Sequence, residues 1–321
     1  MFFGTFLGAC NVPRHIPTEL PTPPPAPRAT PAHKLVPTRD RELEKQFAEI
    51  AASAKGRVGA AAVLLETGDA ATLDGAGRYP SQSVYKLPIA MAVMEKVALG
   101  ELDLDEIVRV TKEDMVRIGF RSPLRDEHPE GGDFSIRQLM DLSITESDGT
   151  ASDVLLRLAG GPNEVQSYLT QIGIHDVKVV NSEKEISRDW ETQYEDWATP
   201  EASVELLRNL KGSPFAGGVD DESLLIKLLA ESEPGERRIK GLLPDGSVVA
   251  HKTGTSGTQN GIHAATNDIG IIYLPNGKRI AIAVYVSDSK ADNATRERVI
   301  AEIAKAVWDK WYNSSATRTT A

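Results

Sequence analysis

The spacing of apolar residues near the start of the body predicts a helix followed by strands. Leu43, Phe47 and Ile50 recur at helical intervals and share one face of a helix that Gly56 ends. Residues 58–66 form an apolar run of strand length, and a Thr-Gly-Asp turn separates this run from a second, shorter strand.

The far end of the chain has the same combination of strands and helix. Apolar residues run from 269 to 274 and again from 280 to 286, and the Pro275-Asn276-Gly277 sequence between them is a strong hairpin signal. A closing helix follows, with a buried stripe made of Ile300, Ile303, Ala304, Val307, Trp308 and Trp311.

The middle of the chain, residues 83–232, is predicted to be mostly helical. Thr199 followed by Pro200 has the pattern of an N-cap with proline at the first helical position. A leucine cluster marks another helix and comprises Leu224, Leu225, Leu228 and Leu229.

These elements predict a protein that is α/β in one part and all-α in another. We expect residues 40–82 and 233–312 to form an α/β domain with an antiparallel sheet flanked by helices. Residues 83–232 would form a helical domain inserted between them, and residues 313–321 would be a loose polar tail.

The first residues have the pattern of an export signal. A short apolar stretch in residues 1–10 leads into Leu7-Gly8-Ala9-Cys10, which resembles a bacterial lipoprotein processing site. No Lys or Arg precedes it, so the other interpretation is an apolar terminus with a chance cysteine. Residues 11–39 are rich in proline and are predicted to be an extended tether. We expect an exported, periplasmic protein anchored to the membrane through lipid on Cys10.

Length, charge and composition exclude several classes. The 321 residues contain no apolar run near the ~18 residues that a membrane-spanning helix needs. A net charge of −10 argues against nucleic acid as a partner. The six histidines are scattered and there is one cysteine, so we expect no Cys/His zinc site, and a disulfide within the chain is impossible.

The first candidate motif is Ser83-Val84-Tyr85-Lys86, at the head of an apolar helical stretch. Ser83 and Lys86 are three residues apart, so on a helix they share a face and the amine can reach the hydroxyl. A buried lysine loses its charge readily and can then act as a base. Because Ser-x-x-Lys arises about once by chance in such a chain, a capped helix with a solvated lysine is an equal interpretation at this point.

Two further motifs follow in order along the chain. Ser147-Asp148-Gly149 supplies a hydroxyl that can pass a proton to a leaving nitrogen, although alone it reads as a turn. Lys252-Thr253-Gly254-Thr255 follows an apolar strand, and its amine and two hydroxyls suit a carboxylate, with Gly254 letting substrate approach the backbone. The alternative for this last motif is a strand that ends in a turn.

Together the three motifs resemble the signature of class A serine β-lactamases and penicillin-binding proteins. The resemblance to class A enzymes extends from Asp40 to about Tyr312, and segments such as 84–88, 251–257 and 265–268 are similar to the extended-spectrum PER-type subgroup. It implies a β-lactamase/transpeptidase-like fold with the active site in the cleft between two domains.

The resemblance also implies roles for individual residues. Ser83 would be the nucleophile, Lys86 and a glutamate the bases, and Ser147 the proton relay, with Lys252 beside it. Counting from the second motif, the water-activating glutamate of the Ω-loop falls on Glu183, with Glu185, Glu191 and Glu195 as rivals. The backbone N–H groups of Ser83 and Thr255 would form the oxyanion hole. The substrate carboxylate would be held by Thr253, Thr255 and Arg238, with Arg237 as the rival arginine.

Four positions depart from the usual class A pattern. Gly149 stands where most members have an asparagine that contacts the substrate, and Ser187 replaces the asparagine that helps to hold the water. Asn181 stands where many members place an arginine that braces the Ω-loop, so this loop must be held in another way. Asp153 replaces another asparagine, as in the PER-type subgroup.

The sequence therefore predicts a serine β-lactamase that hydrolyses penicillins and cephalosporins through an acyl-enzyme, as a monomer and with no metal or organic cofactor. One alternative is a penicillin-binding DD-peptidase or transpeptidase, which would share the three motifs but not need Glu183. The other is a cell-envelope binding protein that has lost turnover, for which Gly149 and Ser187 are the support.

Overall fold

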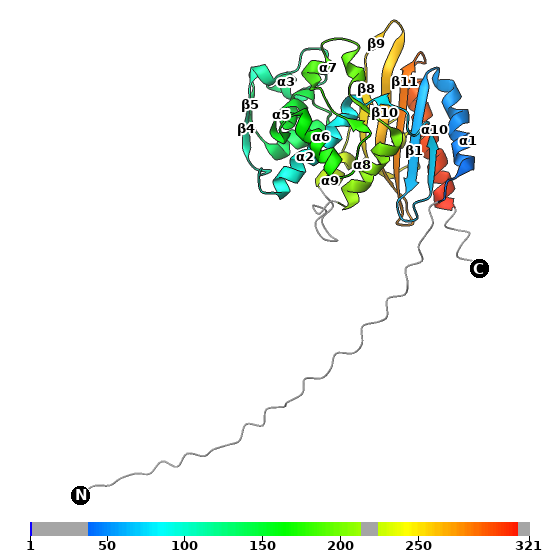
Figure 1. The fold of residues 1–321 in the computed structure, drawn as a ribbon, viewed down its shortest axis with the longest axis horizontal. Coiled ribbons are helices and arrows are strands. Elements are labelled where there is room, and N and C mark those ends of the chain that lie inside the picture. The colour runs from blue at the N-terminus through cyan, green and yellow to red at the C-terminus, as the bar shows by residue number, and fades with distance from the viewer. Residues whose placement is uncertain (2–37, 213–223, 314–321) are drawn as a thin grey trace. The chain divides into compact units, whose positions relative to one another are not determined.

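An antiparallel sheet is built from both ends of the chain. The computed structural model describes Met1 and residues 38–212 and 224–313 (Figure 1). The sheet strands are β1 (Arg57–Leu64), β2 (Ala70–Leu73), β8 (Val248–Thr255), β9 (Thr258–Gln259), β10 (Ile262–Tyr273) and β11 (Arg279–Ser289). Their order is β2-β1-β11-β10-β8, with β9 paired to β10, so the first strand of the chain lies beside the last.

The two faces of the sheet bury different sets of apolar residues. Along β11, Ile280, Ile282 and Val284 face one hydrophobic cluster, while Ala281 and Ala283 face the other. This alternation is the period of two that a strand imposes on its side chains. The sheet is thus covered on both faces, which explains why its strands appear in the sequence as continuous apolar runs.

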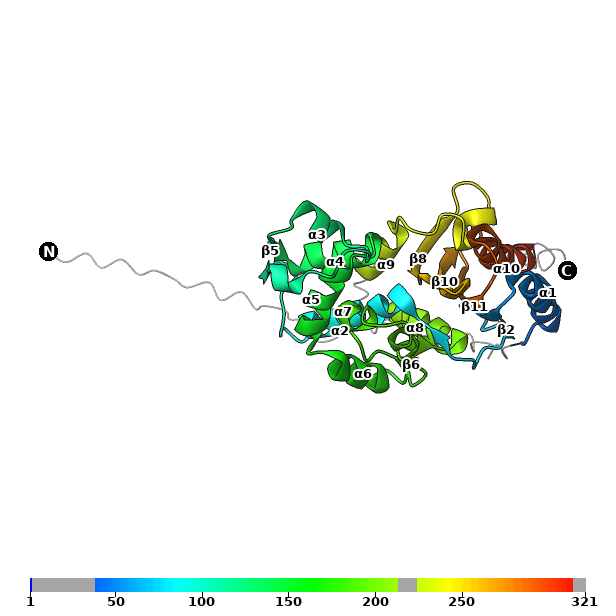
Figure 2. The same cartoon turned by 90° about the horizontal axis from the view of Figure 1, so that it is seen from above.

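Two helices cover the outer face of the sheet (Figure 2). Helix α1 (Arg41–Ala51) begins at Asp40, whose carboxylate accepts a hydrogen bond from the N–H of Leu43. Helix α10 (Asn293–Asn313) packs against α1 and β11. Leu43 and Phe47 are buried against the stripe of α10 that the sequence predicts.

Helices also cover the inner face. Helix α2 (Lys86–Ala98) is buried along its first eight residues and packs against neighbouring helices. The remaining helices are α3 (Pro123–Glu127), α4 (Ile136–Thr145), α5 (Gly149–Ala159), α6 (Pro162–Gln171), α7 (Glu183–Ile186), α8 (Pro200–Gly212) and α9 (Leu224–Ala230). Helix α8 packs directly on β1 and β11, although the sequence assigns it to the helical insertion.

Most of the predicted elements are present, with differences where polar residues are buried. Strand β10 starts at Ile262, seven residues before the apolar run that predicts it, because its first half buries polar residues such as Asn267 and Asp268. Short strand β3 (Tyr79–Pro80) precedes the predicted helical region. That region itself contains four short strands, which are β4 (Ile107–Val110), β5 (Gly132–Ser135), β6 (Val177–Lys178) and β7 (Trp197–Ala198).

Some predictions concern parts of the chain beyond this description. Cys10, residues 11–37 of the expected tether and residues 314–321 of the expected tail lie outside the described residues. Thr38 already belongs to the body, because its carbonyl accepts a hydrogen bond from Ala70 on the edge of the sheet. Among the helices that the structure describes, none is long and apolar enough to cross a membrane.

Candidate active site

Ser83 lies in a short 3₁₀ helix (Gln82–Tyr85) that runs directly into α2. The turn before it is fixed from two sides. The hydroxyl of Ser81 donates to the carbonyl of Asp196 at 3.1 Å, and the side-chain amide of Asn267 donates to the carbonyls of Pro80 and Ser81 at 2.8 and 3.1 Å. Ser83 is half-buried and lines a cleft.

Strand β8 approaches this turn so closely that one position must be glycine. A Cβ atom on Gly254 would lie 2.5 Å from the carbonyl oxygen of Ser81 and 3.1 Å from the Cβ of Gln82. Real Cβ atoms do not come that near a backbone oxygen. The glycine of the third sequence motif therefore lets the strand with Lys252 and Thr253 lie against the turn with Ser83.

The ammonium group of Lys86, at the start of α2, contacts both Glu183 and Ser147. It is 1% exposed, and its Nζ lies 2.8 Å from Oε1 of Glu183 and 2.7 Å from the carbonyl oxygen of Ser147. Ser147 follows α4 with a φ of 61°, a left-handed conformation that a non-glycine residue seldom adopts. The Asp148 carboxylate caps α5 and also accepts from the N–H of Leu124, which holds this turn in place.

Lys252 reaches the same serine from the sheet. Its Nζ donates to the hydroxyl of Ser147 at 2.9 Å and to the carbonyl of Thr253 at 3.2 Å, and the side chain is fully buried. Burial, and then the nearby charge of Lys86, lower the pKa of Lys252 well below its usual value. An anion bound beside Lys252 would therefore stabilise its charged form.

Glu183 is held in the cleft by the backbone of its own loop. It opens α7, and its N–H donates to Oδ1 of Asp153 at 2.7 Å, while the N–H of Lys184 donates to Oδ2 at 3.2 Å. Glu183 is 8% exposed and lines the cleft. Its three rival glutamates line none of the site, and Glu185 instead closes the capping box of α7 with Ser182.

The carboxylate of Asp196 is also buried, and it holds the loop that carries Glu183 at Asn181, the position where the sequence lacks the usual arginine. Oδ1 of Asp196 accepts from the N–H groups of Val180 and Asn181 at 2.7 and 3.1 Å. The side-chain amide of Asn181 donates to Oδ2 of Asp196 at 2.7 Å. Burial raises the pKa of Asp196 to about 6 and that of Asp153 to about 7, although the hydrogen bonds from backbone N–H groups oppose both shifts.

Arg238 stands behind the end of β8. Its guanidinium donates to the carbonyls of Gly254 and Asn267 at 3.1 and 2.8 Å and to the hydroxyl of Thr255 at 2.7 Å. Its Nε lies 3.5 Å from Glu297, so the buried charge is paired. Because the Thr255 oxygen accepts from Arg238, its own proton points elsewhere and is free for another acceptor. The rival Arg237 is 81% exposed.

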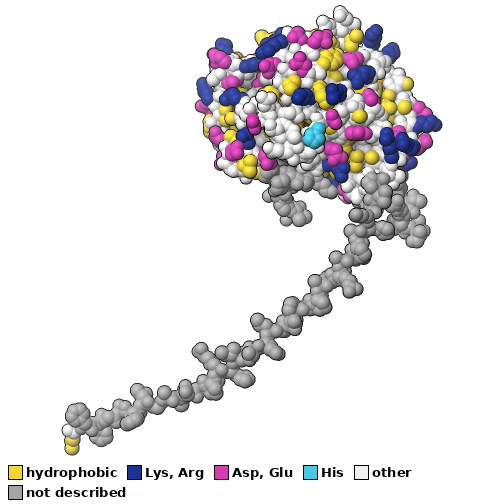
Figure 3. Space-filling view, viewed as in Figure 1, with side chains coloured by type: hydrophobic (Ala, Val, Ile, Leu, Met, Phe, Trp, Pro, Cys, Tyr) yellow, Lys and Arg dark blue, Asp and Glu magenta, His cyan; other side chains and the backbone are white. Residues whose placement is uncertain are grey.

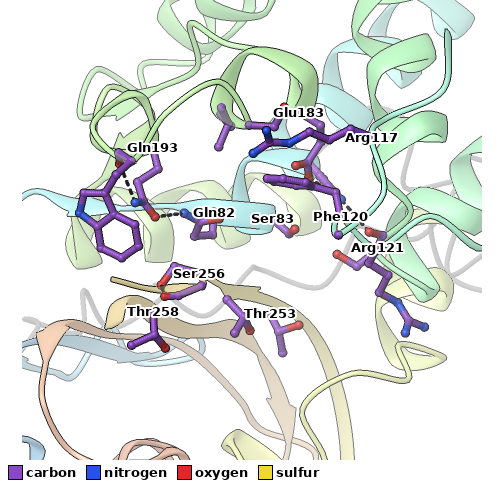
Figure 4. A pocket seen from close by; sticks show the side chains of 18 of the residues that line it. Gln82, Ser83, Arg117, Phe120, Arg121, Glu183, Gln193, Thr253, Ser256 and Thr258 are labelled. Atoms are coloured by element: carbon purple, nitrogen blue, oxygen red, sulfur yellow. Dashed lines mark hydrogen bonds and ion pairs between the residues drawn. The ribbon is translucent and has the colours of Figure 1, made fainter. Parts of the chain in front are cut away.

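These side chains meet in one cleft, in which Figure 4 labels Ser83, Glu183 and Thr253. The lining of this cavity of about 700 Å³ also includes Lys86, Ser147, Ser187 and Thr255. Lys252 and Arg238 are buried and contact Ser147 and Thr255 of this lining, respectively. Acidic and basic side chains are interspersed over the face of the body in Figure 3 and do not gather into one basic patch. Among the described residues, no three His, Cys, Asp or Glu side chains are grouped as a metal ion requires.

Comparison with known proteins agrees with this geometry. A family model described as the β-lactamase enzyme family matches residues 42–311. The chain is 38% identical to β-lactamase VEB-1 of Pseudomonas aeruginosa over 80% of this chain and 86% of that protein. It is 35% identical to extended-spectrum β-lactamase PER-1 of the same organism, over 83% and 86%. A β-lactamase structure from Chitinophaga pinensis DSM 2588 matches with a TM-score of 0.81 and 38% identity, covering 84% of this chain and 100% of that one.

The chain belongs to the class A β-lactamase family. It is a serine β-lactamase, a hydrolase that acts on β-lactams, as the sequence predicts. The predicted fold and the resemblance to the extended-spectrum subgroup are confirmed by the same relatives.

The structure shows what surrounds Gly149 and Ser187, two of the four positions that depart from the usual class A pattern. A Cβ on Gly149 would lie 3.3 Å from both the carbonyl of Arg121 and the Cγ of Glu183, so a side chain there would press on the glutamate. The hydroxyl of Ser187 donates to the carbonyl of Lys184 at 2.6 Å and is thus turned toward the backbone of α7.

The walls of the β-lactamase cleft include residues that sequence reasoning missed. Arg117 lies with its guanidinium 5.1 Å from the centre of the Phe120 ring, and both line the cleft (Figure 4). Opposite them, Gln82 donates to Gln193 at 2.8 Å, and Gln193 donates to the carbonyl of Trp190. None of these residues belongs to a motif, so only the folded loops reveal that they face the substrate space.

Asp153→Asn should reduce the loss of stability that accompanies rising pH. The folded-state pKa of about 7 exceeds the ordinary value of 3.8, so the folded protein holds this proton more tightly than the unfolded chain. The resulting stabilisation is complete below about pH 4, is lost as the pH rises through 7, and is on the order of 4 kcal/mol. Denaturant unfolding of both proteins between about pH 4 and pH 8 measures the change.

Asp133→Asn is the matched control, because this carboxylate is 61% exposed. The control should follow the pH dependence of the native protein. If Asp153→Asn also followed it, the buried carboxylate would not be the titrating group.

Proposed function

We propose that this β-lactamase opens the β-lactam ring through an acyl-enzyme on Ser83. The observation that carries the proposal is the position of Lys86, whose ammonium bonds both Glu183 and Ser147 in the cleft that Ser83 lines. Ser83 Oγ attacks the lactam carbonyl, and its proton leaves to Glu183 through water, or to Lys86 once Lys86 has passed a proton to Glu183 and become a neutral amine. The ring C–N bond then breaks, and the Ser147 hydroxyl relays the proton lost by Ser83 to the nitrogen, which returns Lys86 and Glu183 to their starting protonation states.

Glu183 has its role in the second half of the reaction. In the proposal its carboxylate takes a proton from water as the water attacks the acyl-enzyme carbonyl, which releases the opened product and restores Ser83. The carboxylate lines the cleft beside Lys86, as this step needs. A penicillin-binding peptidase has no need of such a group, so its presence favours hydrolysis over a lasting adduct.

The opposite end of the cleft is proposed to bind the substrate carboxylate. Thr253 and Thr255 offer hydroxyl groups there, and Lys252 lies buried just behind them. Arg238 acts through Thr255, because its guanidinium donates to that hydroxyl and leaves the proton of Thr255 for the substrate. The N–H groups of Ser83 and Thr255 would stabilise the oxyanion, each by about 3 kcal/mol.

Ser83→Ala and Glu183→Ala should fail at different steps. We expect no turnover of a chromogenic cephalosporin by Ser83→Ala. Glu183→Ala should give a brief burst and then stop, while mass spectrometry shows an accumulating acyl-enzyme. Native turnover by Glu183→Ala would contradict the assignment of the water-activating base. A lasting adduct on the native protein would favour the penicillin-binding alternative.

Arg238→Ala should weaken substrate binding more than it slows the chemistry. Loss of the guanidinium frees Thr255 to rotate and removes the 3.5 Å ion pair with Glu297, which keeps the exposed Arg237 at 3.9 Å, so we also expect a loss of stability. We expect KM to rise roughly tenfold with a smaller change in kcat. Arg237→Ala is the control, because Arg237 also pairs with Glu297, at 3.9 Å, but is 81% exposed and does not line the cleft. Equal effects of the two substitutions would assign no specific role to Arg238.

We also propose that the enzyme is exported and anchored by lipid on Cys10, and that it works as a monomer. The support for the anchor is the Leu-Gly-Ala-Cys sequence and the proline-rich segment that follows it. The support for a monomer is that one chain supplies every residue of the cleft.

Metabolic labelling with a radioactive fatty acid tests the anchor. The native chain should carry the label and fractionate with membranes, whereas Cys10→Ser should be unlabelled. If native protein is unlabelled, it is not a lipoprotein.

A further inference from the structure

Tyr85 carries a buried polar group for which the mechanism above has no use. It ends the 3₁₀ helix that contains Ser83, and its ring packs in the hydrophobic cluster on the inner face of the sheet. The side chain is 1% exposed, and its hydroxyl has no hydrogen-bond partner within the described residues. A buried hydroxyl is costly to leave unpaired, so this one needs an explanation.

The hydroxyl faces carboxylates rather than apolar atoms alone. Burial, and then the charges of Glu183, Asp153 and Asp196, raise the pKa of the Tyr85 phenol well above its usual value. Of these three groups, Glu183 is the one close enough to draw on the hydroxyl as a donor, although the contact falls short of a hydrogen bond of ordinary geometry. The phenol therefore keeps its proton, and the Glu183 carboxylate is the strongest of the nearby negative charges acting on it.

Glu183 has few other donors to hold it. Lys86 pairs with Oε1 at 2.8 Å and is its one ion-pair partner in the described part of the chain. Ser187 stands where related enzymes have an asparagine that helps to hold the hydrolytic water. Its hydroxyl donates to the carbonyl of Lys184 and not to Glu183. Ser187 on the α7 side therefore gives the Glu183 carboxylate no hydrogen bond. The unpaired hydroxyl of Tyr85, from the 3₁₀ helix that contains Ser83, is a donor that could take this place.

We propose that Tyr85 is a positioning residue for deacylation. Its hydroxyl donates a hydrogen bond to the Glu183 carboxylate and holds it in the orientation in which it takes a proton from the attacking water. The proton of the water moves to Glu183, and the proton of Tyr85 stays on the phenol. This proposal rests on the role of Glu183 proposed above. It assigns the residue between Val84 and Lys86 a function in the second half of the reaction.

Tyr85→Phe tests the proposal because it removes the hydroxyl and keeps the ring. Rapid-quench mass spectrometry with a slowly hydrolysed cephalosporin separates acylation from deacylation. Deacylation should fall about tenfold while acylation stays within about twofold. The acyl-enzyme then accumulates in the steady state, and KM falls together with kcat.

Tyr285→Phe is the matched control. Its hydroxyl is also buried, and it pairs with Ser203 at 2.7 Å on α8, away from the cleft. This substitution should lower the melting temperature and leave the ratio of the two rates unchanged.

The pH profile of deacylation gives a second readout that packing alone would not move. A donor to a carboxylate favours its charged form, so Tyr85→Phe should shift the acid limb to higher pH. Lys86, Lys252 and Asp153 also face Glu183, from α2, β8 and α5. Because Asp153 itself titrates near neutral pH, the shift must persist when Asp153→Asn is present in both proteins.

The outcomes separate this proposal from the one on which it rests. If Glu183→Ala stalls as an acyl-enzyme and Tyr85→Phe deacylates at the native rate, Tyr85 has no positioning role. If Tyr85→Phe loses acylation and deacylation in parallel, or does not fold, its role is structural and the proposal is wrong. If Glu183→Ala itself turns over normally, the assignment of Glu183 fails first.

Discussion

The buried ammonium of Lys86 is the constraint on which the site depends. A charge that is 1% exposed is tolerated only when it is paired and hydrogen-bonded, and its partners come from two other segments. Glu183 belongs to α7 and Ser147 to the turn between α4 and α5. Satisfying this one cation therefore brings three distant parts of the chain to a common point, beside the proposed nucleophile.

The loop that carries Glu183 shows how a missing ion pair is replaced. Two buried carboxylates, Asp153 and Asp196, accept hydrogen bonds from backbone N–H groups of the segment 180–184, which contains Glu183. Every residue except proline supplies a backbone N–H donor, so this brace does not need an arginine. Its cost is that both acids are buried, which raises their pKa values toward neutrality.

The sequence predicts those members of the candidate site that stand in short motifs, and the fold brings these residues together in one cleft. Ser83, Lys86, Ser147 and Lys252 stand in motifs whose spacing has a chemical meaning, and the glycine of the third motif has a steric one. Glu183 could be chosen over Glu185, Glu191 and Glu195 only by counting from the second motif as in related enzymes, because a single acidic residue in a loop has no sequence pattern of its own. Arg117, Phe120 and Trp190 lie in loops whose conformation depends on tertiary contacts, so no local signal marks them. The early start of β10 was missed for a related reason, since its polar residues are buried by hydrogen bonds that only the fold provides.

The pairing of Arg238 with Glu297 links the closing helix to the substrate end of the cleft. Glu297 is a residue of α10, on the far side of the sheet from α2, and α10 follows the last of the three motifs in the chain. Substitutions in this terminal helix would ordinarily be expected to change only solubility and core packing. Here the helix also contacts, through Arg238, the hydroxyl of Thr255 in the proposed carboxylate site, so directed-evolution libraries confined to the cleft would leave this contact unsampled.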